Sequence, residues 1–451
     1  MLTLERAADA LWNPWLLGLF LVTGLWYSVR TGFFQLFGLK TWLKATVASL
    51  FARRNRGGGG LSQTQALATA LASTIGTGSI AGVATAVVLG GPGAVFWMWV
   101  SAVLGMMTGC AEKTLAVAYR ERGEDGGWQG GPMCYMARGL HSPVLAACFC
   151  LCCLGSSLAG GNLVQANSIA TALEAAWGCP RLAVGVLTAL ACGAVIWGGV
   201  GRIGKVSESL VPLMAFLFLA GGCAVLWTQR TYLPDAFRAI LEGAFRPAAP
   251  VGYVAASAIR YGVARGVFTN EAGMGSSAMA HAAARVEDPA EEGMWGILEV
   301  GVATLLVCTV TALVILTTGV YDPLTAGTAL QEGHVPEGML GAPLAARAFS
   351  TVLGQWGTAL VAVCLLLFAF TSLVGWSYYG ERCLHWLTGG TRGRTAYRAL
   401  CLVAIVAGST WELGAVWQLA DLWNGLMALP NLLALLLLTP KALELLRQWV
   451  R

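Results

Sequence analysis

Long apolar runs recur along almost the whole chain, and they constrain its fold more than any other feature of the sequence. A helix needs about 20 predominantly apolar residues to cross the hydrocarbon core of a bilayer. The 451-residue chain contains eleven such runs. They lie at residues 12–29, 65–88, 93–118, 143–176, 182–199, 208–227, 252–280, 293–318, 344–380, 397–412 and 417–439. The sequence therefore predicts an all-α polytopic membrane protein with about 11 transmembrane helices.

The low charge content excludes most other classes of protein. Only 11% of the residues are charged and 57% are hydrophobic, whereas an ordinary soluble domain has about 25% charged residues. The net charge of +5 comes from Lys and Arg in short loops between apolar runs, which is not the pattern of a nucleic-acid binder. The sequence contains no GxxxxGKS or GxxxxGKT loop and no HExxH motif. We expect a protein in a lipid bilayer that is not an enzyme and has no cofactor, nucleotide or nucleic acid as a partner.

Basic residues mark the loops that are expected to face the cytoplasm. The loop after the first span contains no acid but carries Arg30, Lys40, Lys44, Arg53, Arg54 and Arg56. Because Lys and Arg concentrate in cytoplasmic loops, we place this loop inside, the N-terminus outside and the C-terminus inside. Segment 319–343 then lies outside, and it has Asp322, Glu332 and Glu337 but no Lys or Arg. With no cleavable secretory leader, the chain is expected as a multi-pass protein of the cytoplasmic (inner) membrane of a prokaryote.

Two predicted spans are interrupted by glycine, serine and threonine at mid-membrane. Residues 71–85 read LASTIGTGSIAGVAT, and residues 266–280 read GVFTNEAGMGSSAMA. The two spans lie five apart in the chain, so they run in opposite directions. Gly-interrupted segments at corresponding positions of two halves point to the central site of a transporter. The sequence therefore predicts one leading helix and two inverted five-helix repeats, with the first helix of each repeat broken.

This repeat divides the chain into five parts. They are an N-terminal span with its basic cytoplasmic loop (1–64), the first repeat (65–227), an external loop (228–251), the second repeat (252–440) and a cytoplasmic tail (441–451). Unwound backbone inside a membrane needs polar partners. Half-helix N-termini suit a carboxylate, and freed carbonyls suit a cation. The breaks therefore predict a zwitterion or anion that travels with a cation, although the glycines alone also permit close helix packing.

Motifs around these breaks resemble those of a known family. The most specific stretch is GGPGAVFWMWVSAVLG (90–105), and the others are GTGSIAGVATA (76–86), GGPMCYMARGL (130–140), GNLVQANSIA (161–170), AIRYGVARGVFTNEAGMGS (258–276) and GWSYYGERC (375–383). In these motifs and in their order along the chain, the sequence resembles the alanine/glycine:cation symporters, also called sodium:alanine symporters, from about residue 60 to 440. The resemblance implies the amino acid transporter fold with inverted five-helix repeats. It also implies sodium-coupled symport of alanine, glycine or a similar small neutral amino acid.

The resemblance implies a substrate site at the two breaks. The residues expected to bind the amino acid are Thr74, Thr77, Gly78, Gln165, Phe268, Thr269, Met274 and Trp376. Backbone N–H groups near Thr77 and Gly78 are expected to meet its carboxylate. Met274 stands where Leu is frequent in the family, and Met is the more adaptable side chain. Packing is the alternative role for Trp376, and a partner on a neighbouring helix is the alternative for Gln165.

A sodium site is implied between the second and ninth spans. Carbonyl oxygens are expected from Ala72, Ile75 and Phe368, and hydroxyl oxygens from Thr371 and Ser372. Hard oxygen ligands without full countercharge suit a monovalent cation better than a divalent one. Ser79 stands where Asn is common in the family, and its shorter side chain has less reach for a second ion.

Two polar residues at the second break are candidates for coupling or for structure. Glu271 is an acid within an apolar span, where a charged carboxylate is costly. It either attracts the cation, carries a proton or pairs with Arg265 or Arg260 as a gate, or it braces the unwound backbone. Asn270 is expected to brace the break.

Four further ionisable residues lie near span ends. Glu112, Glu208 and Glu299 are expected to snorkel or pair at the cytoplasmic interface. His281 follows the second broken segment and is expected to stack or cap at the inner mouth, with a proton relay as the alternative.

The leading interpretation is a secondary active symporter that couples sodium entry to amino acid uptake by alternating access. Within transport, the alternative is a proton-coupled symporter of another small zwitterion. A passive channel or a sensor on the same fold is the alternative from another class. A symporter shows a saturable, ion-dependent flux, whereas a channel does not accumulate its substrate against a gradient.

Overall fold

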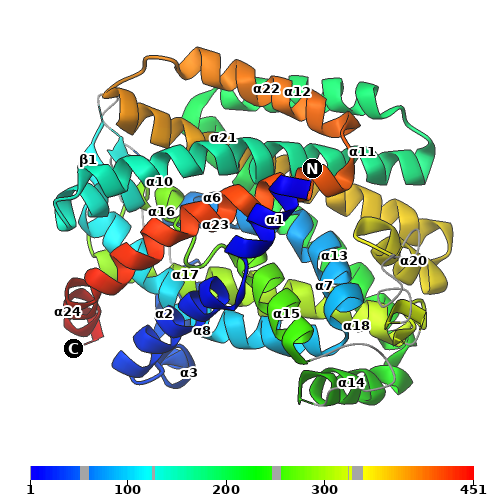
Figure 1. Ribbon diagram of the computed structural model, residues 1–451. Coiled ribbons are helices and arrows are strands. Elements are labelled where there is room, and N and C mark those ends of the chain that lie inside the picture. Colours follow the sequence, from blue (N-terminus) through cyan, green and yellow to red (C-terminus); the bar gives the residue numbers. More distant parts are fainter. Residues whose placement is uncertain are drawn as a thin grey trace.

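The structure is a computed structural model that describes residues 2–50, 60–123, 127–245, 255–323, 325–327 and 339–450. The described chain is almost entirely helical (Figure 1). Some residues used to predict the orientation, namely Arg53, Arg54, Arg56, Glu332 and Glu337, lie outside the described residues.

A leading helix precedes the two repeats. The N-terminal helices are α1 (Leu2–Leu11), α2 (Pro14–Arg30), α3 (Phe34–Phe37), α4 (Leu39–Ala45) and α5 (Val47–Leu50). Of these, α2 corresponds to the first predicted span. Pro14 suits its first position because the N–H that proline lacks has no partner inside a helix there. The buried side chains of Leu16, Leu17 and Phe20 lie on the side of α2 that meets the rest of the protein.

The next five spans begin with a broken helix. They are α6 (Gln63–Thr74) with η1 (Thr77–Ser79) and α7 (Ala81–Gly90), α8 (Gly93–Ala118), α10 (Pro143–Ser156) with η3 (Ser157–Leu163) and α11 (Val164–Trp177), α12 (Arg181–Ile196), and α13 (Gly199–Thr228). The connection from α8 to α10 contains an antiparallel hairpin of β1 (Glu121–Arg122) and β2 (Trp128–Gln129), followed by α9 (Pro132–Cys134) and η2 (Tyr135–Gly139).

The last five spans also begin with a broken helix. After η4 (Arg230–Tyr232) and α14 (Leu233–Phe245), they are α15 (Ala255–Asn270) with α16 (Ala278–Ala282), α17 (Pro289–Val300) with η5 (Gly301–Cys308) and α18 (Thr309–Thr317), α21 (Gln355–Thr388), α22 (Arg394–Thr410), and α23 (Leu413–Leu437). Two further helices are α20 (Ala342–Leu353), which precedes α21, and α24 (Thr439–Val450) at the C-terminal end. The order confirms one leading helix and two sets of five.

The spans differ in length. Within the described chain, six continuous helical stretches are long and apolar enough to cross a membrane, namely 93–118, 143–177, 199–228, 289–317, 355–388 and 414–437. Three others are single helices of 17, 16 and 17 residues, namely α2, α12 and α22. The remaining two are the broken pairs α6/α7 and α15/α16. Together these elements account for the eleven predicted spans.

Two predicted span boundaries are wrong, and one predicted loop contains a helix. The ninth span, predicted at 344–380, is divided at Gly354, whose φ of +58° is costly for other residues. As a result α20 is a separate helix, and α21 extends to Thr388. The sixth span begins at Gly199 instead of residue 208, so Arg202 and Lys205 lie within α13 and not in a loop. The predicted external loop 228–251 contains the helix α14, whose charged and apolar residues give it an amphipathic pattern.

The spans form two groups that meet at the centre of the molecule. In the first group, α8 packs against α15 and α17, and α15 packs against α7. In the second group, α12 packs against α22, and α21 packs against α10 and α11. Figure 1 shows the second group above α8, α15 and α18. The two broken helices belong to the first group, and α6 contacts α21 of the second.

Close backbone contact holds the first group together. A β-carbon on Gly296 of α17 would lie 2.6 Å from the carbonyl oxygen of Gly109 on α8. Glycine at this crossing therefore allows the two helices to approach closely, as small residues do in membrane proteins.

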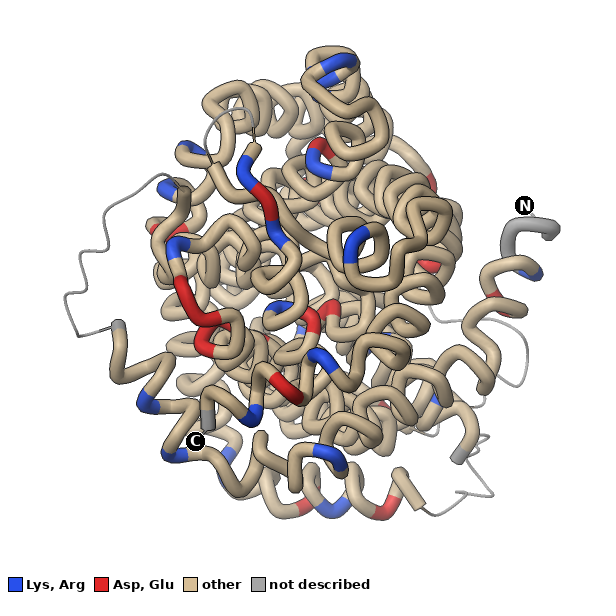
Figure 2. The backbone as a smooth tube through the Cα atoms, turned by 90° about the vertical axis from the view of Figure 1, so that its left-hand side faces the viewer, with Lys and Arg blue, Asp and Glu red and all other residues tan. Residues whose placement is uncertain are grey.

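The outward faces of α12, α13 and α22 are apolar. Leu187 on α12, Phe216 on α13 and Val403 on α22 are 66%, 68% and 63% exposed. Figure 2 shows that charged positions are few along the backbone and that Lys and Arg occur at the end of the molecule that carries the C-terminus. These features are those of a multi-pass membrane protein.

Candidate functional site

The first break interrupts the second span at Ile75 and Gly76. Helix α6 begins with a capping box, in which the Ser62 hydroxyl accepts from the Gln65 N–H and the Gln65 side chain accepts from the Ser62 N–H. It ends at Thr74, and Gly76 is extended with φ −111° and ψ −155°. A β-carbon on Gly76 would lie 2.7 Å from the Ser372 hydroxyl oxygen. The predicted break is therefore present, and glycine provides the room for α21 beside it.

The second break follows α15. Glu271, Gly273 and Gly275 have φ values of +55°, +93° and +78°, a region that favours glycine and is uncommon for glutamate. The Asn270 amide oxygen accepts from the Ala272 N–H at 3.0 Å, and its nitrogen donates to Thr304 Oγ1 at 3.2 Å. Both ends of the Asn270 amide therefore have partners at the break in this conformation.

Side chains from other helices satisfy the unwound backbone at Gly273. Its N–H donates to Glu112 Oε1 at 2.9 Å, and its carbonyl accepts from Asn431 Nδ2 at 2.9 Å. Asn431 Nδ2 also donates to Glu112 Oε1 at 2.7 Å. Backbone that leaves a helix inside a membrane needs such partners, and here α8 and α23 provide them.

Glu271 is 2% exposed and accepts a hydrogen bond from the Ser276 hydroxyl across the break. The gate-pair interpretation of this residue is wrong for this conformation, because both candidate arginines pair elsewhere. Arg265 pairs with Asp421 at 2.9 Å, and Arg260 pairs with Asp9 at 2.5 Å. Glu271 instead lines a central cavity between the two broken helices.

The central cavity brings together five of the residues expected to bind substrate. These are Thr74, Gly78, Gln165, Phe268 and Trp376. Residues that the sequence analysis did not single out for the site, namely Ser73, Gly76, Gly160 and Asn424, also line it. The cavity volume is about 10 Å³, which is room for about one water molecule. The cavity is therefore tightly closed in this conformation.

Three expected substrate residues lie beside the cavity and do not line it. The Thr77 N–H donates to Gln165 Oε1 at 3.3 Å, so Gln165 already occupies a backbone donor at the break. Thr269 Oγ1 donates to the Arg265 carbonyl at 2.8 Å. Met274 is fully buried in the hydrophobic core, so its side chain packs against other core residues in this conformation.

The oxygen atoms expected to bind sodium converge where α6 meets α21. Ser372 Oγ donates to the Ala72 carbonyl at 2.9 Å. Thr371 Oγ1 lies 3.3 Å from the same carbonyl oxygen and 3.0 Å from the Phe368 carbonyl oxygen. Ile75 is the residue that follows the last turn of α6, and it is fully buried. Four of the five predicted residues thus share one hydrogen-bonded cluster.

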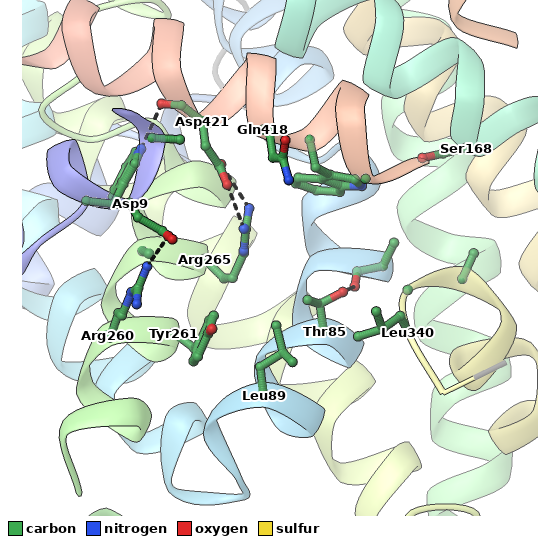
Figure 3. Close-up of a pocket in the computed structure, with 18 of the residues that line it drawn as sticks. Asp9, Thr85, Leu89, Ser168, Arg260, Tyr261, Arg265, Leu340, Gln418 and Asp421 are labelled. Atoms are coloured by element: carbon green, nitrogen blue, oxygen red, sulfur yellow. Dashed lines mark hydrogen bonds and ion pairs between the residues drawn. The ribbon is translucent and has the colours of Figure 1, made fainter. Parts of the chain in front are cut away.

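A larger cavity of about 330 Å³ lies between α1, α7, α15 and α23 (Figure 3). We call it the vestibule. Figure 3 shows Arg265 directed toward Asp421 and Arg260 directed toward Asp9. The first pair is bidentate, with N···O distances of 3.1 and 2.9 Å.

Aromatic rings lie between the vestibule and the central cavity. Phe268 lines the central cavity, and its ring centroid is 5.1 Å from that of Trp417, which lines the vestibule. The Arg265 guanidinium lies 4.8 Å from the Trp417 ring centroid, within the range of a cation–π contact. Sequence reasoning missed Asp421 and Trp417. The available signal was the acid Asp421 in the apolar span 417–439, because a buried charge needs a partner and the span 252–280 contains two arginines.

The expectation for Glu112 and Glu299 is wrong in one respect. Both side chains are fully buried and do not snorkel, and Lys113 lies 3.9 Å from Glu112 and 3.2 Å from Glu299. Glu208, by contrast, is exposed and accepts from Thr64 and Gln65 at the start of α6. The tertiary fold places α8 and α17 at the centre, which the position of an acid along a span does not reveal.

These features define a class of protein: a multi-pass transporter whose two broken helices enclose a central site. Solved structures share the fold. Two variants of the manganese transporter of Eremococcus coleocola match with TM-scores of 0.51 and 0.52, at 18% identity, over 85% of this chain and 78% of that chain. The predicted fold with inverted five-helix repeats is thereby confirmed.

Residues 2–451 match the sodium:alanine symporter family, and the chain belongs to that family. It is 40% identical over 432 residues to the sodium/alanine symporter AgcS of Methanococcus maripaludis, covering 95% of this chain and 92% of that protein. It is 35% identical to the probable sodium/glutamine symporter GlnT of Bacillus subtilis, covering 99% of this chain and 90% of that protein. The family predicted from the motifs is confirmed, and with it sodium-coupled amino acid symport as the kind of transport.

Proposed function

We propose that the protein carries alanine, glycine or a similar small neutral amino acid into the cell together with sodium. It does so by alternating access in the cytoplasmic membrane of a prokaryote, with the N-terminus outside and the C-terminus inside. Residues 65–227 and 252–440 form the two repeats. The observation that carries this proposal is the meeting of both broken helices at one cavity, with an oxygen cluster beside it.

The central cavity offers complementary groups for a zwitterion. Gln165 Oε1 occupies the Thr77 N–H in this conformation, and a substrate carboxylate takes its place at the N–H groups of residues 77 and 78. The Glu271 carboxylate also lines the cavity, and this carboxylate and the freed carbonyls of the breaks are groups that suit an ammonium group. Phe268 and Trp376 limit the space for the side chain, which favours a small substrate.

The sodium ion links the two groups of helices. Its proposed ligands are the carbonyl oxygens of Ala72, Ile75 and Phe368 and the hydroxyl oxygens of Thr371 and Ser372. Because Ala72 and Ile75 lie on the broken second span and Thr371 and Ser372 on α21, the ion stabilises the arrangement in which these elements touch. Sodium thereby completes the substrate site formed by the same elements.

Two sets of contacts close the opposite ends of the site. At the end predicted to face outside, the pairs Arg265–Asp421 and Phe268–Trp417 separate the vestibule from the central cavity. At the other end, the Leu61 N–H donates to the Ala283 carbonyl at 3.0 Å, and the Arg285 N–H donates to the Leu61 carbonyl at 2.8 Å. Transport requires these two closures to open in turn.

Uptake by proteoliposomes tests the proposal. Purified protein is given labelled alanine under an inward sodium gradient, and then under potassium or proton gradients at matched membrane potential. Accumulation with sodium alone supports the proposal. Accumulation with protons alone assigns coupling to another ion and directs attention to Glu271, and equilibration without accumulation indicates a passive pathway.

Competition defines the substrate. Unlabelled glycine, alanine and glutamine are added in excess, because relatives of this chain carry names that refer to alanine and to glutamine. Because the bulky rings of Phe268 and Trp376 line the cavity, we expect glycine and alanine to compete more strongly than glutamine. Stronger competition by glutamine contradicts the assignment to a small amino acid and leaves sodium coupling intact.

A further inference from the structure

His281 in α16 places both of its ring nitrogens against carboxylates. Nδ1 lies 2.7 Å from Glu292 Oε1, and Nε2 lies 3.1 Å from Glu299 Oε2. All three side chains are fully buried. Neither the sodium cluster nor the central cavity includes any of them.

This arrangement requires one proton more than a neutral histidine between two ionised carboxylates provides. A neutral imidazole has one N–H donor and one unprotonated nitrogen, and an ionised carboxylate has only acceptors. With neutral His281 and two ionised carboxylates, a nitrogen lone pair faces a carboxylate oxygen in a buried site. Both contacts are hydrogen bonds when the imidazole carries two protons, and such charge-assisted hydrogen bonds are the strong ones.

The imidazole is the better place for this proton. Lys113 Nζ lies 3.2 Å from Glu299 Oε2, which favours an ionised Glu299. The second oxygen of Glu292 accepts from Gln63 Nε2 at 3.1 Å, so this carboxylate has donors on both sides. In water, an imidazole also binds a proton more tightly than a carboxylate does.

Other titratable and charged groups surround His281, and in the described structure His281 is the side chain that contacts both Glu292 and Glu299. From α8 come Glu112 and Lys113, and Arg120 beyond its end donates to the Ala282 and Ala284 carbonyls at 3.2 and 2.6 Å. From α17 come Glu291, Glu292 and Glu299, and α6 contributes the Gln63 amide.

Helix α21 and the hairpin also pack near His281. On α21, the Tyr379 hydroxyl forms a hydrogen bond with the Ser73 hydroxyl, and Glu381 and Arg382 form an ion pair with one another. The hairpin strand β2 contributes the uncharged Trp128 and Gln129.

We propose that His281, Glu292 and Glu299 form a proton-binding site that holds the inner ends of both broken helices against α17. His281 lies in α16, after the second break, and Gln63 lies in the first turn of α6, before the first break. Both helices bind α17 through Glu292. The site binds its proton while this end is closed and releases it to the cytoplasm when α6 and α16 separate from α17.

The consequence of this proton-binding site for transport rests on the alternating access proposed above. A proton that binds the closed state more tightly stabilises that state. Low internal pH therefore opposes opening to the cytoplasm, and high internal pH favours it. We expect sodium-driven uptake to rise about 5-fold or more as internal pH increases across the titration of the imidazolium, in the range of coupling between two sites.

Nitrogen NMR of the full-length protein tests the proton without using transport. The chain contains 4 His, and ¹⁵N-histidine labelling in lipid with sodium present reports protonation of each ring. The variant His281→Gln assigns the signal, and His385→Gln is the matched control on α21. We expect His281 to carry two protonated nitrogens at about pH 8, where an unperturbed histidine is neutral. An unprotonated nitrogen on His281 at this pH overturns the proposal.

A second pair of variants keeps the test decisive if His281→Gln does not fold. Glu292→Gln removes one carboxylate, so His281 is expected to lose its second proton at about pH 8. Glu291→Gln makes the same change one residue away and is expected to leave the His281 signal as it is. An unchanged signal in Glu292→Gln contradicts the site.

The transport arm distinguishes this proposal from the proposed function. Sodium-driven uptake is measured at fixed external pH while the internal pH is varied. The dependence on internal pH is expected to disappear in His281→Gln and to persist in His385→Gln. A pH dependence that persists in His281→Gln overturns the role in opening, whereas failure of alanine uptake at every pH counts against the proposed substrate and leaves the NMR result valid.

Discussion

At the scale of single residues, the candidate site depends on where a side chain is missing. Gly76 and Gly78 allow α21 and α15 to approach the first break, since a β-carbon at these positions would lie 2.7 Å from Ser372 Oγ and 2.9 Å from Thr269 Oγ1. Side chains with hydroxyl groups fill the space that glycine leaves. A change of one carbon atom is therefore expected to alter ion binding as well as packing.

Replacing Gly76 with alanine tests this close approach. In Gly76→Ala the β-carbon displaces Ser372, and overpacking of this kind costs about 1–3 kcal/mol. Because 1.4 kcal/mol is about a tenfold change in affinity, we expect the sodium concentration for half-maximal uptake to rise roughly 5- to 100-fold. Gly82→Ala is the control, since no atom lies within 4 Å of a β-carbon there. An unchanged sodium titration in Gly76→Ala removes residue 76 from the ion-binding region.

Removing the Thr371 hydroxyl tests the sodium cluster directly. Thr371→Ala deletes an oxygen that lies 3.3 Å from the Ala72 carbonyl oxygen. We expect weaker sodium dependence of uptake, with a half-maximal sodium concentration raised about tenfold or more. Thr388→Ala lies at the exposed end of the same helix and is the control. If sodium titrates Thr371→Ala and the unmodified protein alike, the ion does not bind at this cluster.

At the scale of elements, each broken helix is stabilised by other helices. Gly273 in the second break obtains both of its backbone partners from side chains, Glu112 on α8 and Asn431 on α23. In the first break, the Ser79 carbonyl accepts from Thr311 Oγ1 on α18 at 2.8 Å. The breaks are therefore fixed parts of the fold whose shape depends on their neighbours, and not local losses of helix propensity alone.

Removing the Asn431 amide tests how far the second break depends on α23. In Asn431→Ala the Gly273 carbonyl loses its partner and Glu112 loses a donor. A buried polar group without a partner costs about 1–3 kcal/mol, so we expect a lower thermal midpoint in detergent and reduced uptake. Asn13→Ala is the control, because the exposed Asn13 side chain makes no capping hydrogen bond. Equal thermal midpoints for the two variants contradict this role of Asn431.

At the scale of the whole molecule, two groups of helices meet at the central cavity and the sodium cluster. The vestibule lies at one end, beyond the Arg265–Asp421 pair. The backbone bridge between Leu61 and Ala284 lies at the other. The outer closure joins α15 to α23, and the inner closure joins the segment before α6 to the segment after α16. Each closure therefore opens only when its own pair of elements separates.

Two ion pairs in the vestibule provide a matched test of the outer closure. Asp421→Asn breaks a largely buried bidentate pair, in which the side chains are 12% and 20% exposed. Asp9→Asn breaks an exposed pair, and exposed pairs contribute little. We expect uptake to fall about tenfold or more in Asp421→Asn with substrate binding retained, and to change less than about 2-fold in Asp9→Asn. Equal uptake by the two variants shows that the Arg265–Asp421 pair is not part of the closure.

Much of the fold was predictable from the long apolar runs, and the errors in that prediction have local causes. The eleven spans and both breaks were predictable because a bilayer imposes a minimum length and because glycine-rich interruptions in long apolar runs are conspicuous. The boundary at Gly354 was missed because its left-handed backbone divides an otherwise continuous apolar run. Helices α14 and α24 were missed because amphipathic helices lack the long apolar run of a span.

The candidate site was predictable where a motif surrounds each residue, and not where partners come from distant helices. The resemblance placed Gln165 and Trp376 at the central cavity. It gave no indication of Asp421, Trp417 or Asn424, each on α23. Met274 is adjacent in sequence to the site but is buried in the core, because the left-handed turn at Gly273 and Gly275 redirects the chain.

The sequence by itself determined the class of protein, the number of spans, the two breaks and the family, since these depend on local composition and on motifs along the chain. The tertiary structure alone decided the charge pairing. Glu112, Lys113, Glu299 and His281 are distributed over three helices, and only their packing brings Glu299 within 3.2 Å of Lys113 and 3.1 Å of His281. Buried charges need partners at hydrogen-bond distance, and the distance between two helices is a property of the packed bundle, not of either segment.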